Sequence, residues 1–251
     1  MPGERATDRM VLGIGGADRA KFLHGLVTRD VGPPGAGLTY SAILTPQGKY
    51  LADFFLLDRG DDILLDVKAE LAPKLAQRLS MYRLRADVTI TDSGLSVARG
   101  LGDPPEGAFA DPRDPSLGWR GYGMDGGAPV IDWDAIRVAA CIPETGIELI
   151  PDESYILECG FDRMGGVDHR KGCYVGQEVT ARMKHKTELR KGLVTVAVTG
   201  AAPVGTPIMA GDREAGVLYT QAGGQGIAYL RFDRAGEPMT AGDAKVIWKP
   251  A

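Results

Sequence analysis

The segment His169–His185, HRKGCYVGQEVTARMKH, surrounds a cysteine with residues that could make it reactive. Lys171 lies two positions before Cys173, and a helix is expected to begin near Gly176. A nearby cation and a helix N-terminus both favour a thiolate over a thiol, and Gly172 leaves room for a ligand or another backbone. The pattern predicts either a working thiol or a small buried hydrophobe, which is the common use of a free cysteine.

The sequence gives less support to metal binding or to the other two cysteines. Cys141 and Cys159 have no basic neighbours, so we expect both to be structural. His169 and Cys173 supply two ligands where a structural zinc or an iron–sulfur cluster normally takes four. No metal is therefore predicted, and a Cys–His nucleophile pair would need an orienting third group that the sequence does not identify.

Charge is distributed unevenly along the chain. Residues 169–191 hold seven Lys or Arg and two acids, one of which is Glu188, and this segment is therefore +5 in a chain of net charge −4. Such a segment fits an anionic ligand, an acidic partner or simply a solvated helix face. The acidic total and a pI near 5.5 do not favour nucleic acid.

Composition and the N-terminal residues predict a soluble cytoplasmic protein with no membrane contact. Three cysteines form no disulfide framework, which fits a reducing compartment. The first residues, MPGERATDRMVLGIGG, resemble neither a signal peptide nor a transit peptide. No apolar run approaches the ~18–20 residues that span a bilayer.

Hydrophobic periodicity indicates an α+β protein. A strand at residues 10–13 precedes a helix over 17–27 with a buried stripe of Phe22, Leu23 and Leu26. Residues 38–67 read as successive strands separated by turns, followed by a helix over 69–82 and a strand over 85–91. Consecutive strands of this kind pair in antiparallel fashion and do not form a doubly wound sheet.

The second half of the chain changes character twice. Glycine and proline are abundant over residues 102–129, which predicts a long irregular connection. A helix over 132–140 is expected with Asp132 as its N-cap. After Lys191, short strands alternate with glycine-rich turns, as in a small β-barrel. The predicted regions are therefore 1–191, made of two interleaved subdomains, and a barrel at 192–251.

The segment KGCYVGQE resembles the K-G-C-Y-x-G-Q-E signature of the YgfZ family of folate-binding proteins, which is related to the aminomethyltransferase of the glycine cleavage system. Other segments are similar to the same family over most of the chain. They are FLHGLVTRDV, LTPQGKYLADF, FADPRDPSLGWRGY and RVAACIPETG.

The resemblance implies an aminomethyltransferase-like fold, with two α+β subdomains and a barrel arranged as a ring around a folate channel. It implies that the chain binds tetrahydrofolate, in polyglutamylated form if the basic segment holds the tail, and assembles or repairs iron–sulfur clusters in client enzymes. Cys173 is then the active thiol, held as thiolate by Lys171. The expected motif-loop or folate-binding residues are Gly172, Tyr174, Gly176, Gln177, Glu178 and Arg182.

Two departures from the family pattern weigh on the alternatives. Ala139 stands where transferase relatives carry an acid that holds the pterin ring, which argues against one-carbon transfer. His169 stands where the family commonly has an aromatic residue, so it is not expected to be an obligatory base. The resemblance favours an assembly factor over a turnover enzyme. A folate-dependent one-carbon transferase and a non-catalytic scaffold with a basic docking helix remain the alternatives.

Overall fold

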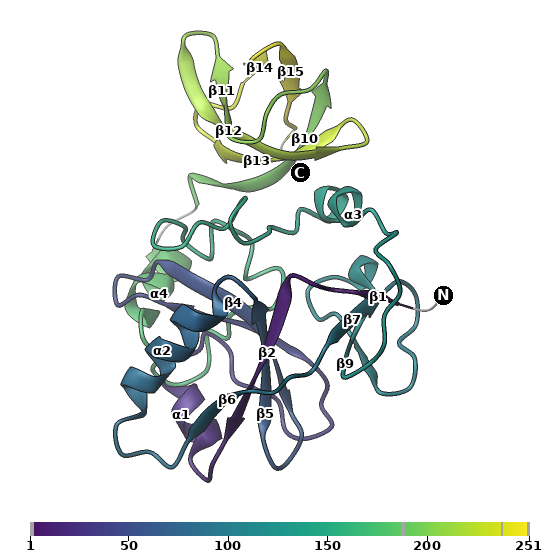
Figure 1. Cartoon of the computed structure of the whole chain (residues 1–251). Coiled ribbons are helices and arrows are strands. Elements are labelled where there is room, and N and C mark those ends of the chain that lie inside the picture. The colour runs from purple at the N-terminus through teal and green to yellow at the C-terminus, as the bar shows by residue number, and fades with distance from the viewer. Residues whose placement is uncertain (1–2, 187–188, 237, 250–251) are drawn as a thin grey trace. The chain divides into compact units, whose positions relative to one another are not determined.

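The computed structural model describes residues 3–186, 189–236 and 238–249. The chain folds as two compact units, each built from two segments. The first unit contains Met1–Ile131 and Asp162–Val179, and the second contains Asp132–Phe161 and Thr180–Ala251. The division between the units falls within helix α4 (Gln177–Lys186), between Val179 and Thr180. Figure 1 labels the helices and strands. In the described part of the chain, no helix is long and apolar enough to cross a membrane.

A five-stranded antiparallel sheet with order β3-β4-β5-β2-β6 is the main element of the first unit. In that order the strands are Thr39–Leu44, Tyr50–Asp58, Ile63–Lys68, Arg9–Gly15 and Thr89–Asp92. Two helices pack on one face of it, namely α1 (Arg19–His24) and α2 (Ala72–Arg83). The predicted order of strands and helices in this region is confirmed.

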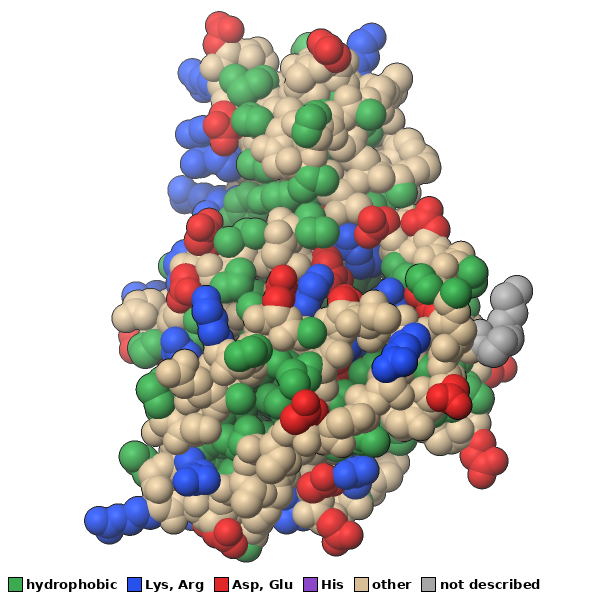
Figure 2. Space-filling model, viewed as in Figure 1, with side chains coloured by type: hydrophobic (Ala, Val, Ile, Leu, Met, Phe, Trp, Pro, Cys, Tyr) green, Lys and Arg blue, Asp and Glu red, His purple; other side chains and the backbone are tan. Residues whose placement is uncertain are grey.

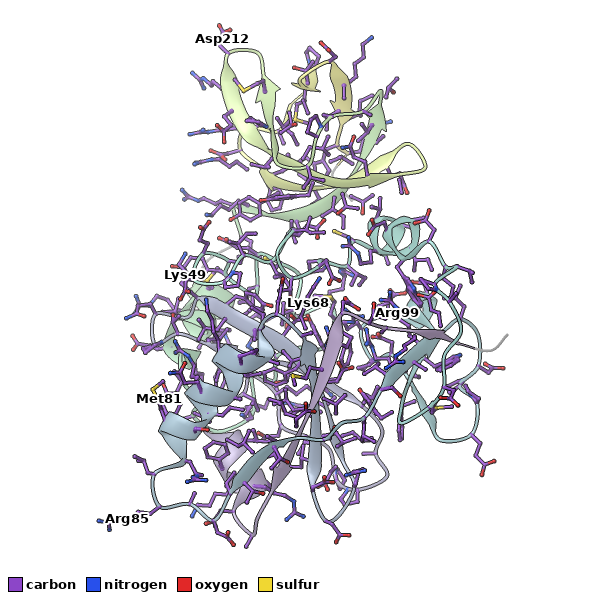
Figure 3. All side chains as sticks on the ribbon, in the orientation of Figure 1. Lys49, Lys68, Met81, Arg85, Arg99 and Asp212 are labelled. Atoms are coloured by element: carbon purple, nitrogen blue, oxygen red, sulfur yellow. The ribbon has the colours of Figure 1, made fainter. Side chains whose placement is uncertain are left out.

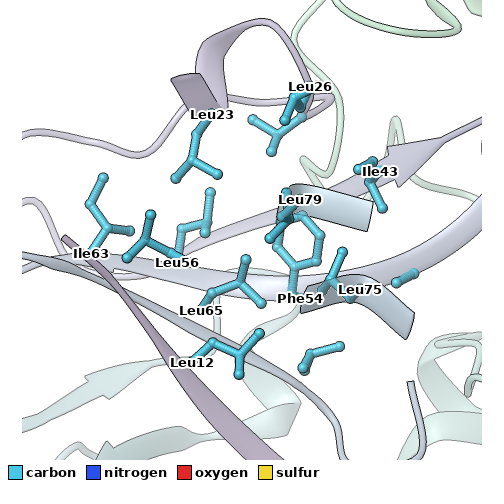
Figure 4. Close-up of a cluster of buried hydrophobic side chains, with 14 of the residues drawn as sticks. Leu12, Leu23, Leu26, Ile43, Phe54, Leu56, Ile63, Leu65, Leu75 and Leu79 are labelled. Atoms are coloured by element: carbon cyan, nitrogen blue, oxygen red, sulfur yellow. The ribbon is translucent and has the colours of Figure 1, made fainter. Parts of the chain in front are cut away.

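Side chains alternate across this sheet because successive residues of a strand point to opposite faces. Leu65 of β5 lies in the core beneath the helices with Leu23 and Leu75 (Figure 4). The adjacent Leu64 lies in a different apolar cluster on the other face, with Val97 of a second sheet. The central sheet is therefore covered on both sides, which explains why its strands read as nearly continuous apolar runs.

The second sheet of this unit corrects the prediction of an irregular connection over residues 102–129. It has four strands in the order β1-β7-β9-β8, which are Glu4–Arg5, Val97–Gly100, Trp119–Tyr122 and Ala108–Ala110. A short 3-10 helix, η1 (Pro115–Leu117), precedes β9. Two of these strands lie inside the glycine-rich segment. They are too short to show a period of two, and β9 gains its order by pairing with β7.

An arginine–aspartate cluster joins the two sheets of the first unit, made of Arg9, Asp66, Asp111, Arg113 and Arg120. Arg120 donates to Asp111 at 3.2 Å and to Asp66 at 3.3 Å, and its guanidinium lies 4.1 Å from the ring centroid of Phe55. Arg9 donates to the other oxygen of Asp66 at 2.7 Å, and Arg113 donates to Asp111 at 2.8 Å. All five side chains are buried, so each charge depends on its partners.

The second unit contains helix α3 (Trp133–Ala140) and a closed six-stranded barrel. The carboxylate of Asp132 accepts a hydrogen bond from Ala135 N at 3.0 Å, which confirms the predicted cap. The barrel strands β10 to β15 are Lys191–Thr199, Thr206–Ala210, Arg213–Ala222, Gln225–Arg231, Met239–Ala241 and Ala244–Ile247. Strand β14 is not among the predicted strands, whereas the barrel itself is confirmed. The division between residues 191 and 192 stays a prediction.

Candidate functional site

The motif loop, residues 168–176, lies against the chain that follows α1. Asp168 N donates to Thr28 O at 3.0 Å, and Val175 N donates to Gly25 O at 3.2 Å. Between these two backbone contacts the loop carries Cys173, whose residue is exposed. The structure therefore places the cysteine on a loop that is held at both ends by a segment 140 to 150 positions earlier in the chain.

Lys171 is the buried anchor of the motif loop. Its side chain is 3% exposed, and its ammonium donates to His24 O at 2.7 Å and to Val27 O at 2.6 Å. The ammonium also lies 3.0 Å from a carboxylate oxygen of Asp30 and 5.0 Å from the ring centroid of Tyr174. Desolvation lowers the pKa of Lys171, and the hydrogen bond that its ammonium donates to Asp30 offsets part of this shift.

These contacts give Lys171 a bracing role that sequence reasoning did not anticipate. A lysine in a polar loop is normally solvated. The ammonium of this one instead donates its hydrogen bonds to oxygens at the end of α1 and in the residues after it. Its predicted action on the Cys173 thiolate stays a prediction.

Two glycines of the motif make close approaches, at Gly172 to a side chain and at Gly176 to backbone. A Cβ on Gly172 would lie 2.8 Å from Nε2 of His24. Gly176 has φ +84°, and a Cβ there would lie 2.5 Å from Thr45 O in the turn between β3 and β4. Left-handed backbone and steric contact both exclude other residues at position 176. The glycines therefore let the loop fit between α1 and the β3–β4 turn.

The start of α4 holds the loop from its other side. The side-chain amide of Gln177 donates to Gly172 O at 3.3 Å and, more weakly, to Lys171 O at 3.5 Å. Tyr174 is buried, whereas Glu178 and Arg182 are exposed. Gln177 and Tyr174 thus contribute to the shape of the loop, and Glu178 and Arg182 face solvent, where a ligand or partner could meet them.

The three cysteines differ in their surroundings. Cys173 is exposed, Cys141 is partly buried at the end of α3, and Cys159 is buried. Burial, together with the charge of Glu158, raises the pKa of Cys159 to about 12. Cys159 is therefore a poor nucleophile near neutral pH, and among the three thiols Cys173 has the greatest access to a reagent or partner.

Sequence reasoning did not identify His24 and Asp30 as site residues. His24 Nδ1 lies 2.7 Å from a carboxylate oxygen of Asp30, while Nε2 faces Gly172. A carboxylate on one ring nitrogen orients an imidazole so that the other nitrogen can exchange a proton. Both residues belong to the segment FLHGLVTRDV, whose resemblance to the family was the available signal, although the family pattern specifies Asp30 and not His24. His169 instead pairs with Asp162 at 2.9 Å.

The basic segment divides between two places in the structure. Lys171 is buried in the first unit, whereas Arg182 and Lys184 are exposed on α4. In the barrel, Lys191 and Arg231 are cross-strand neighbours. Figure 2 shows Lys and Arg side chains gathered along one edge of the barrel. Glu188 and the side chain of Lys186 lie outside the described residues. The cations of this segment are therefore divided between the interior of the first unit and exposed positions on α4 and the barrel.

Metal ligands and cavities are two further features that could mark a binding site in this chain. Within residues 3–186, 189–236 and 238–249, no group of three or more His, Cys, Asp or Glu side chains is placed to hold a metal ion. A cavity of about 300 Å³ in the first unit is lined by Leu57, Leu64, Phe109 and Tyr122, among others. It lies at the end of β4 opposite the turn that contacts Gly176, so it is separate from the motif loop.

The fold has a known counterpart. The glycine cleavage system aminomethyltransferase T from Bartonella henselae superposes with a TM-score of 0.72, covering 96% of this chain and 82% of that chain at 13% identity. The predicted aminomethyltransferase-like fold is confirmed. Residues 190–251 match the family described as the CAF17 C-terminal beta-barrel domain.

Sequence relatives are named as iron–sulfur cluster assembly factors. The human mitochondrial protein IBA57 is 30% identical over 94% of this chain and 79% of its own length. The chain belongs to the IBA57 family. The mouse protein is 29% identical with the same coverage, and the homolog from Mycosarcoma maydis is 32% identical over 75% of this chain. The chain spans 55% of the Mycosarcoma maydis protein and 54% of the Pyricularia oryzae protein.

These relatives correct one expectation and limit another. The names of the IBA57 relatives place them in mitochondria, which contradicts the predicted cytoplasmic location. Unpaired cysteines indicate a reducing compartment without saying which one, so the prediction was more specific than its evidence. The relatives carry the name IBA57, so membership of the YgfZ family itself stays a prediction, whereas the aminomethyltransferase-like fold that the resemblance implied is shown.

Proposed function

We propose that this chain is an accessory factor for the assembly or repair of iron–sulfur clusters in other proteins, with Cys173 as its working thiol. The observation that carries the proposal is the exposed Cys173 on a loop locked by Lys171, in a member of the IBA57 family. An assembly factor must present a reactive atom to another protein. A thiol raised on a rigid, accessible loop suits that task.

The proposal extends to tetrahydrofolate as a ligand, which the aminomethyltransferase-like fold supports by analogy. The exposed cations of α4 and the barrel edge, among them Arg182 and Arg190, suit the carboxylates of a polyglutamate tail. Ala139 lies exposed on α3 and offers no carboxylate to a pterin ring. That absence favours folate as a bound ligand of an assembly factor over folate as acceptor in aminomethyl transfer.

Rescue of a strain that lacks the gene tests the function. Wild type, Cys173→Ser and Cys141→Ser are expressed at equal levels, and several iron–sulfur enzymes are assayed beside an enzyme without a cluster. We expect wild type and Cys141→Ser to restore the cluster enzymes and Cys173→Ser to fail, with the cluster-free enzyme unchanged throughout. Full rescue by Cys173→Ser would instead indicate a scaffold.

Calorimetric titration tests the ligand separately. Tetrahydrofolate and its pentaglutamate are titrated into the full chain at low and high salt. We expect the pentaglutamate to bind more tightly, with the difference shrinking as salt screens the charge. Arg182→Gln should reduce that difference without abolishing monoglutamate binding. Equal affinity of both forms at low salt would exclude this use of the basic residues.

A further inference from the structure

The C-terminal end of α2 exposes three large apolar side chains on the first unit. Met81, Tyr82 and Leu84 are 63%, 37% and 88% exposed. The apolar stripe that α2 uses to bind the sheet is separate, because Ala72, Leu75 and Leu79 are buried in the core. We call these three exposed residues the α2 tip. They are not needed to hold the helix in place.

Leu84 is held in a conformation that suits glycine. Its φ of 47° and ψ of −106° are close to the first central position of a type II′ turn, and Ala86 N closes that turn on Arg83 O at 2.8 Å. Among the described residues, only Leu84, Cys141 and Asp152 have positive φ without being glycine. A bulky residue there stores strain, yet the side chain makes the most exposed large apolar surface of this set.

Positive charge borders the α2 tip. Arg85 is exposed and Arg78 is partly exposed, while the guanidinium of Arg83 is directed to Val88 O at 3.3 Å. The carboxylates of Asp87 and Asp18 also lie here, where they accept from Ala17 N and Asp87 N. The three arginines outnumber these two acids. Figure 3 shows Met81 and Arg85 both projecting outward from this end of α2. The surface combines apolar anchors with cations.

We propose that the α2 tip is a docking site for a partner protein through a segment that combines acidic residues with one or two large apolar side chains. Charge complementarity supports this occupant, because Arg85 and Arg78 would pair with carboxylates around an apolar contact at Leu84. A membrane surface fits less well. The outer face of α2 is polar at Lys74, Gln77 and Ser80, so no continuous apolar face is left to lie in a bilayer.

This surface goes beyond the proposed cluster function and does not depend on Cys173. The hydrogen-bonded turn fixes the backbone that carries Leu84, which reduces the backbone entropy lost on binding. Leucine at position 84 does not stabilise the isolated chain, since glycine would adopt the same backbone conformation without strain.

The test uses the full chain and an array of short peptides that combine Asp or Glu with Leu, Ile or Phe anchors. Matched peptides replace each acid with lysine. The tightest binder is then measured by fluorescence anisotropy against wild type, Leu84→Gly, Arg85→Glu and Val204→Ser. Val204 is an exposed apolar residue of the barrel, so its variant controls for loss of apolar surface elsewhere.

We expect acidic peptides to bind and lysine peptides not to bind. Leu84→Gly should weaken binding by about tenfold or more while raising or preserving the thermal midpoint, which separates binding from folding. Arg85→Glu should also weaken binding, and Val204→Ser should match wild type.

Three results would overturn the proposal. The first is no preference for acidic over lysine peptides, and the second is binding by Leu84→Gly equal to wild type. The third is binding to vesicles of phosphatidylcholine and phosphatidylglycerol that Leu84→Gly abolishes, with no peptide binding, which would assign the α2 tip to a membrane.

Discussion

The arginine–aspartate cluster and the motif loop are both charged groups of the first unit, and they differ in what they leave open. In the cluster, Arg120 and Asp66 are buried and hold each other between two sheets. In the motif loop the side chain of Lys171 is also buried, but its partner Asp30 is partly exposed and Cys173 of the loop is exposed. Both segments carry strong sequence signals, since DPRDPSLGWRGY supplies three residues of the cluster.

The difference separates structural charge from functional charge. A closed network satisfies every charge internally and can only stabilise or destabilise the fold. The motif loop uses one buried charge to fix a backbone on which an exposed thiol is displayed. Changes in the cluster should therefore alter stability most, and changes at the thiol should alter reactivity with the fold intact.

The largest effect is expected for Arg120→Met, which leaves Asp66 and Asp111 buried with a partner removed. Breaking a buried ion pair from one side costs about 3–5 kcal/mol. Urea unfolding monitored by circular dichroism measures the loss. Arg85→Met, at an exposed site, is the matched control and should stay within about 0.5 kcal/mol of wild type. A loss below about 1 kcal/mol for Arg120→Met would show that the cluster is not closed.

Acid should weaken the same cluster through Asp111. Burial opposes its charged form, but Arg113 and Arg120 outweigh burial and lower the pKa of Asp111 from 3.8 to about 2. Because the folded-state pKa is depressed, this stability is present above pH 3.8 and is lost as the pH falls toward 2. The shift corresponds to about 2 kcal/mol.

Unfolding free energies of wild type and Asp111→Asn between pH 5 and pH 2, measured at fixed ionic strength, test this shift. The gap between the two proteins should narrow by about 2 kcal/mol as the pH falls. A gap that stays constant over this range would contradict the assigned pKa.

A smaller loss is expected for Lys171→Met in the motif loop. The change leaves two backbone carbonyls, those of His24 and Val27, without their charged donor. Unsatisfied buried acceptors cost about 1–2 kcal/mol here, since Asp30 can turn to water. In this variant, hydrogen exchange of the loop amides should be faster than in wild type, and the free energy of unfolding measured in urea should be lower. Lys184→Met on exposed α4 is the control, and equal stability of the two variants would contradict the bracing role.

Much of this fold could be predicted because the patterns that indicate it involve residues close together in the sequence. The cap at Asp132 and the antiparallel strands between residues 38 and 67 depend on short-range patterns of polarity and turn residues. The barrel was predictable for the same reason, apart from the three-residue strand β14. Loop chemistry at Gly172 and Gly176 could likewise be anticipated from the motif.

Contacts distant in sequence account for what was missed. Strand β9 pairs with β7 across a glycine-rich segment that shows no strand period. Lys171 is buried by carbonyls 144 and 147 positions away, so no local pattern could indicate its burial. His24 and Asp30 are six positions apart, but nothing local indicates that this pair lies beside the motif loop. The signal available for Asp30 was family resemblance, which identifies a position without showing its partner.

Site-resolved alkylation tests most directly whether the motif loop presents Cys173 as the reactive thiol of this chain. The folded protein is treated with iodoacetamide at pH 7.5, and mass spectrometry follows modification of Cys141, Cys159 and Cys173. We predict that Cys173 reacts first, at least about 100-fold faster than the buried Cys159, whose thiolate is scarce at this pH. Unfolding in urea should make the three rates similar. Reaction of Cys173 no faster than Cys141 in the folded protein would contradict the account.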